Sequence, residues 1–158
     1  MPTAPVRRAV TAAALTAVFA LPSMSAQALA DTGDEDIVRV RLTGVTTVDT
    51  KPWHVKAGDS WTTYLELYSP KKKFVGDASA RCSAVEATEH RLTTQCTRVL
   101  RLKKGEITLH DVITRVDRSP ITAKTSIAGG TGIYNDAEGE GYITLDGDRV
   151  HFDLHVDD

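Results

Sequence analysis

The sequence lacks the features that mark several large classes of protein. Its 19 lysine and arginine residues are outnumbered by 21 aspartate and glutamate residues, so it has no basic excess of the kind that nucleic-acid-binding proteins carry. Its longest apolar run, residues 9–21, has thirteen residues, whereas a membrane-spanning helix needs about 20. We therefore expect no nucleic-acid partner and no membrane contact of the mature chain.

Motifs for nucleotides and metals are missing as well. The glycines at positions 129, 130 and 132 form neither a Gly-x-Gly-x-x-Gly nor a Gly-Lys-Ser/Thr pattern, and no helix-forming stretch follows them. His151 and His155 are four residues apart on a predicted strand, a separation of about 13 Å that prevents them from sharing a metal ion. We expect no metal and no cofactor.

The first thirty residues have the pattern of a secretory signal peptide. Arg7 and Arg8 supply a positive segment, the apolar run follows, and residues 28–30 (Ala-Leu-Ala) place small side chains at the cleavage positions. The arginine pair raises a twin-arginine signal as an alternative, but the residues around it favour ordinary secretion. We predict a signal peptide at residues 1–30, a flexible acidic N-terminus at 31–36 and one extracellular domain at 37–158.

From residue 37 onward, apolar and polar residues alternate, which is the pattern of half-buried strands. Turn signals such as Ser69-Pro70 and Asp146-Gly147 separate the strands, and no ten-residue window has a convincing helical period. The pattern predicts an all-β fold, an eight-stranded antiparallel up-and-down β-barrel, with a sandwich as the alternative. The expected strands are residues 37–48, 60–69, 74–86, 90–102, 106–115, 121–128, 141–145 and 149–156.

The two cysteines, Cys82 and Cys96, lie at equal distances from Glu89 in the sequence. If residues 74–102 form one hairpin that turns around Glu89, the two cysteines are directly opposite each other and within reach of a disulfide. An exported protein meets an oxidising environment, which favours the bond. Two free buried thiols are the alternative. The same register places Ala80 opposite Arg98.

Residues 126–139 are rich in glycine and lie between two predicted strands. Glycine is favoured where the backbone takes a positive φ or passes close to another segment. The stretch therefore predicts a tight corner of a closed or strongly curved sheet. The residues that form this structural corner are Gly129, Gly130, Gly132 and Gly139.

The pattern of this corner, Ile-x-Gly-Gly-x-Gly-Ile-x-x-x-Ala-x-Gly, resembles one found in plant allene oxide cyclases and, more loosely, in plant dirigent proteins. Two further stretches resemble strands of the same family: Gly58-Asp59 with Leu67-Tyr68, and residues 73–76 continuing to Cys82. Together they cover about residues 58–145. The chain looks like a secreted bacterial member of this barrel family.

The resemblance implies an eight-stranded barrel with an apolar, partly aromatic lumen, often assembled as a homotrimer. The polar groups of the plant cyclases do not carry over. Their cavity asparagine matches Leu65, the first predicted strand here contains no acid, and the cysteine that matches theirs, Cys82, has Cys96 as a predicted partner. The resemblance therefore implies the barrel without the allene oxide cyclase reaction, and no catalytic set is identified.

The resemblance also indicates which residues face the lumen. Small alanines opposite Arg98 leave room for a ligand, and Arg98 then needs an acidic partner, either on the ligand or on the protein, unless it reaches water near the end of the barrel. Trp61 serves either as a stacking platform or as plain core. The candidate ligand-binding residues are Trp61, Thr63, Leu65, Leu67, Ala80 and Arg98.

Two hypotheses for the function follow. In the first, the barrel binds a small apolar molecule and guides its cyclisation or isomerisation, as its relatives do. In the second, it is a non-catalytic binding or interaction module with a closed core. A cavity of several hundred cubic ångströms favours the first, and a lumen filled with side chains favours the second. His110 and Asp111 are adjacent on a predicted strand and point to opposite faces, so they are not expected to act together.

Overall fold

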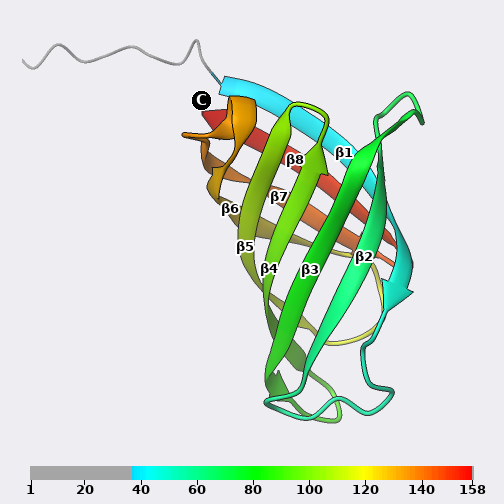
Figure 1. The fold of residues 1–158 in the computed structure, drawn as a ribbon. Helices are drawn as coiled ribbons and strands as arrows, with labels where there is room; N and C mark the ends of the chain where they lie inside the picture. Colours follow the sequence, from blue (N-terminus) through cyan, green and yellow to red (C-terminus); the bar gives the residue numbers. More distant parts are fainter. Residues whose placement is uncertain (1–36, 158) are drawn as a thin grey trace, which may run out of the picture. The chain divides into compact units, whose positions relative to one another are not determined.

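The computed structural model describes residues 37–157, which form a closed barrel of eight antiparallel strands in sequence order (Figure 1). The predicted fold class is therefore confirmed, and the predicted signal peptide lies outside the described residues. The described part of the chain contains no helix with the length and apolar character needed to cross a membrane. The elements are β1 (Ile37–Asp49), β2 (Ser60–Tyr68), β3 (Phe74–Ala87), β4 (Leu92–Leu102), β5 (Gly105–Arg115), β6 (Ile121–Gly130), η1 (Gly132–Tyr134), β7 (Glu138–Asp146) and β8 (Arg149–Asp157).

The alternating sequence pattern produces this barrel because successive side chains of a strand point to opposite faces. In β2, for example, Trp61, Leu65 and Leu67 are buried inside the barrel while Ser60 and Tyr64 are exposed. Away from the glycine corner, the bounds of the predicted strands agree with the observed ones to within two residues. There β6 continues to Gly130, β7 begins at Glu138, and the single turn of 3-10 helix η1 lies between them.

The hairpin β3–β4 has the predicted register. Cys82 pairs with Cys96 and Ala80 pairs with Arg98 across the two strands. The two cysteines form a disulfide, which confirms the bond predicted from their symmetric placement about Glu89. The disulfide therefore joins two neighbouring strands of the barrel, and both cysteines are buried.

The two ends of the barrel differ. The β1–β2, β3–β4, β5–β6 and β7–β8 connections share one end, which we call the mouth, and the other three connections share the opposite end, which we call the base. Large aliphatic and aromatic side chains, including Leu67, Leu100, Leu109 and Leu154, fill the base half of the lumen. Smaller residues line the mouth half beside Trp61: Ala80, Cys82, Ala84 and Cys96.

The glycine corner closes the base. Figure 1 shows η1 beside the β4–β5 turn, and two backbone hydrogen bonds, from Thr131 N to Glu106 O (2.9 Å) and from Ile133 N to Lys104 O (3.1 Å), hold the two segments together. A Cβ on Gly130 would lie 2.3 Å from the carbonyl oxygens of both Glu106 and Tyr134. Only glycine permits so close an approach, which explains the glycine-rich pattern by packing.

We expect Gly130→Ala to lower the free energy of unfolding by about 3 kcal/mol, because the new methyl group meets backbone atoms that cannot move aside. Gly147→Ala is the control: Gly147, unlike Gly130, has a positive φ (60°), and it has open space around it, so about 1 kcal/mol is expected from backbone strain alone. Urea denaturation of both variants measures the difference. Equal losses would contradict the role of close packing at Gly130.

Candidate functional site

A pocket of about 120 Å³ enters the lumen from the mouth. We call it the inner pocket. It opens into a wider hollow of about 620 Å³ between the loops of the mouth, which we call the vestibule. Asp49, Lys51, Leu92, Arg115 and Gly147 line both spaces and therefore mark the junction between them.

Part of the wall of the inner pocket is made of small side chains and one aromatic ring. Cys82 and Cys96 contribute their disulfide, and Thr63 and Thr94 contribute half-buried hydroxyl side chains. Trp61 is only 7% exposed, so its ring forms a fixed apolar surface on one side of the pocket. This wall suits a flat or compact apolar group.

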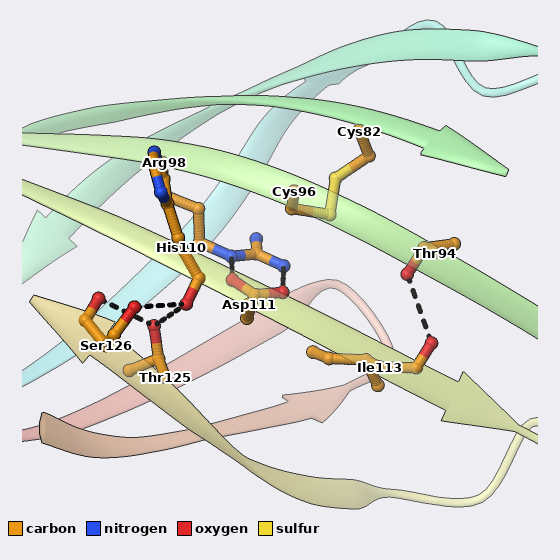
Figure 2. A network of polar contacts seen from close by, with 9 residues as sticks. All are labelled: Cys82, Thr94, Cys96, Arg98, His110, Asp111, Ile113, Thr125 and Ser126. Atoms are coloured by element: carbon orange, nitrogen blue, oxygen red, sulfur yellow. Dashed lines mark hydrogen bonds and ion pairs between the residues drawn. A yellow bond between two sulfur atoms is a disulfide. The ribbon is translucent and has the colours of Figure 1, made fainter. Parts of the chain in front are cut away.

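A buried ion pair lies beside the disulfide on the same inner face of the barrel (Figure 2). The Arg98 guanidinium donates from Nε to Asp111 Oδ2 at 2.6 Å and from Nη2 to Asp111 Oδ1 at 3.1 Å. The two side chains are 6% and 0% exposed. Thr125, on the neighbouring strand β6, is also buried and donates its hydroxyl hydrogen to the His110 carbonyl oxygen at 3.1 Å.

The ion pair resolves the alternatives for Arg98. Its acidic partner is the carboxylate of Asp111. Arg98 therefore needs neither contact with water nor an acidic ligand to balance its charge. Sequence reasoning missed Asp111 as this partner. The signal was present, because Asp111 stands between the buried residues Leu109 and Ile113 at a position where the alternation calls for an apolar residue. Its opposite residue, Cys96, was already placed inside the barrel.

The predicted lumen residues fall into two groups. Trp61, Thr63 and Arg98 line the inner pocket. Leu65 and Leu67 are buried in the aliphatic cluster of the base half, and Ala80 is buried beside the disulfide. The lumen is thus neither open along its length nor fully closed: the base half is packed, and the mouth half contains a small pocket.

The β1–β2 connection adds a cation that sequence patterns did not reveal. Lys51 as a whole is exposed, but its ammonium reaches back over the Trp61 ring, with Nζ 5.5 Å from the ring centroid. Burial lowers the pKa of Lys51, the positive charges of Arg115 and Arg118 lower it further, and the carboxylate of Asp49 opposes the change. The carboxylate of Asp49 therefore offsets burial and the neighbouring arginines only in part.

The barrel is similar to several solved structures. A pyocyanin demethylase gives a TM-score of 0.60 at 24% sequence identity, with 75% of this chain and 99% of the other covered. AbnU, an exo-specific intermolecular Diels-Alderase, gives 0.59 at 14% identity, with 76% and 97% covered. The pterocarpan synthase dirigent protein PsPTS1 gives 0.57 at 14% identity, with 77% and 95% covered. The sequence matches no protein-family model and no curated protein sequence.

These similarities define the class of fold. The chain has the eight-stranded barrel of the allene oxide cyclase and dirigent-like proteins, as the glycine corner and the alternating strands predicted. At these sequence identities the similarity extends to the fold, and the chemistry of the protein has to be sought in its own inner pocket.

Proposed function

We propose that this protein is a secreted barrel that binds a small, mostly apolar molecule in its inner pocket and guides the cyclisation or isomerisation of that molecule. The observation that carries the proposal is the unequal filling of the lumen. The base half is packed with large side chains, whereas small side chains beside Trp61 leave a hollow that opens to the outside. A preformed concave site with apolar walls is the usual form of a small-molecule site.

The inner pocket favours guidance by shape over covalent catalysis. Its two cysteines are joined in a disulfide and so offer no thiol nucleophile, and residues 37–157 contain no free cysteine. Arg98 and Asp111 satisfy each other. A wall of this kind promotes a reaction by holding a flexible molecule in a reactive conformation. The solved relatives include a Diels-Alderase and a pterocarpan synthase, which is consistent with such a role.

A non-catalytic module with a closed core is the second candidate, and the packed base half favours it. The inner pocket, at about 120 Å³, is smaller than the several hundred cubic ångströms expected for a whole ligand. In our proposal the ligand therefore places one end in the inner pocket and the rest in the vestibule. The two candidates differ in one respect: blocking the inner pocket abolishes ligand binding only if our proposal holds.

Native mass spectrometry of the protein purified from its own culture medium tests the proposal. We expect extra mass that is present in the native spectrum and absent under denaturing conditions. Thr63→Phe should abolish the extra mass, because Thr63 lines the inner pocket. Thr97→Phe is the matched control: Thr97 is exposed on β4 between two inward-facing residues, and its variant should keep the ligand. Extra mass that survives in Thr63→Phe would place the ligand elsewhere, and its absence from the unaltered protein would favour the closed module.

The same spectra test secretion and assembly, which are also part of the proposal. The disulfide fits the oxidising conditions outside the cell, and residues 1–30 are predicted to direct export. We expect the mass under denaturing conditions to be that of a chain that begins at Asp31, less two hydrogen atoms for the disulfide. The native mass should be a multiple of it, three by the family resemblance.

A further inference from the structure

The lining of the inner pocket carries more positive than negative charge. Four cationic side chains line the inner pocket, namely Lys51, Arg98, Arg115 and Arg149, and Asp49 is the one acidic residue among the lining residues. Asp111 neutralises Arg98 from the barrel wall. Three cations then remain against one carboxylate.

None of these three cations has a carboxylate partner within the described chain. The ion pairs found among residues 37–157 involve other lysines and arginines. Arg115 donates from Nη2 to the Ser119 carbonyl oxygen at 3.1 Å, which leaves most of its guanidinium donors unused. Asp49 accepts the backbone N–H of Lys51 at 2.9 Å, so part of its acceptor capacity is directed to the main chain.

The position of Lys51 makes this excess of charge relevant to the ligand. Its ammonium lies over Trp61, the aromatic wall of the inner pocket, and both Lys51 and Arg115 line the passage through which a ligand enters. Burial and then the positive charge of Arg115 lower the pKa of Lys51, and the carboxylate of Asp49 offsets them only in part. An anionic group at the junction would meet both side chains while an attached ring lay against Trp61.

We infer that the ligand carries an anionic group, a carboxylate or its equivalent, and that Lys51 and Arg115 bind this group at the junction while the apolar part of the ligand occupies the inner pocket. This inference rests on the proposed function and narrows the class of ligand. It assigns recognition of the ligand to side chains outside the buried Arg98–Asp111 pair. Lys51 and Arg115 are specificity-determining residues in this scheme, and the ring of Trp61 orients the apolar part.

Calorimetric titration with a matched pair of probes, 2-naphthoate and 2-naphthamide, tests the inference at low ionic strength. The two probes share the same ring system and differ in charge. We expect the purified protein to bind the carboxylate about tenfold more tightly than the amide, the gain typical of a charge-assisted hydrogen bond. Lys51→Met combined with Arg115→Gln should remove this preference, so that the double variant binds the carboxylate no more tightly than the amide. Lys51→Arg should retain it.

Lys56→Met is the control, because Lys56 belongs to the same connection but lines neither the inner pocket nor the vestibule. This variant should keep the full preference for the carboxylate. Equal affinity for the two probes, or a preference that survives the double substitution, would overturn the inference while leaving ligand binding intact. Binding of neither probe would count against the proposed function as well.

Discussion

Replacing Asp111 with asparagine is expected to lower the free energy of unfolding by about 3–5 kcal/mol, the loss typical of removing one partner from a buried ion pair. The substitution leaves the Arg98 guanidinium buried without a counter-charge, since both side chains are almost completely hidden from water. Urea denaturation monitored by circular dichroism measures the loss. No other carboxylate can replace it, because Asp111 is the only buried acidic residue among the described residues.

Asp77→Asn provides the control for this prediction. Asp77 also pairs with an arginine, Arg101, at 2.8 Å, but the Arg101 side chain is 61% exposed. Solvent screens such a pair, so its loss should cost less than about 1 kcal/mol. A double variant, Arg98→Met with Asp111→Leu, should recover most of the stability, because apolar residues of similar size replace the whole pair. If Asp111→Asn costs no more than Asp77→Asn, the Arg98 charge must reach water.

Reducing the disulfide is expected to destabilise the barrel by about 3 kcal/mol in the chain-entropy model, which considers the closure of a loop of about 15 residues. Cys82 and Cys96 are 14 residues apart, so the bond restricts one hairpin of the unfolded chain. The measurement is the urea midpoint of the native protein with and without reductant. Mass spectrometry of each sample should show the gain of two hydrogen atoms on reduction.

The double variant Cys82→Ala, Cys96→Ala is the matched control for the disulfide. Its urea midpoint should be lower than that of the native protein without reductant. Adding reductant should not change it, because the variant has no bond to reduce. A reductant effect of the same size in this variant would assign the destabilisation to the reagent. An unchanged midpoint for fully reduced native protein would show that the bond adds no stability, although it lines the inner pocket.

Local patterns in the sequence were sufficient to predict the strands that form the wall of the barrel. Alternation of side chains identifies strands because it reports which face of each strand is buried. The equal spacing of Cys82 and Cys96 about Glu89 set the register of one hairpin, and that register placed Ala80 opposite Arg98. The glycine corner was predicted as a corner, but the hydrogen bonds by which it joins the β4–β5 turn depend on a segment twenty-five residues away in the sequence.

The interior was harder to predict, because it depends on several strands at once. Arg98 reaches Asp111 diagonally: the residue directly opposite Arg98 on β5 is Leu109, and Asp111 lies opposite Cys96. The pattern of a single strand does not show such a diagonal pair. The unequal filling of the lumen likewise results from the sizes of side chains on all eight strands.

The placement of Lys51 was not predictable for a different reason. It belongs to the connection between β1 and β2, which has no alternating pattern to report the direction of its side chains. Its position over Trp61 depends on the path of that connection across the mouth. The charge at the junction is therefore a property of the folded chain and cannot be read from the order of residues.

The packed base of the barrel has a consequence for the order of events at the proposed site. Since large side chains block the lumen below the inner pocket, a molecule held there leaves by the route through which it entered. The inner pocket is open at one end only, so a new molecule cannot enter before the bound one has left. Substrate and product of any reaction in the inner pocket therefore cannot be bound together, and product inhibition should be competitive with the substrate.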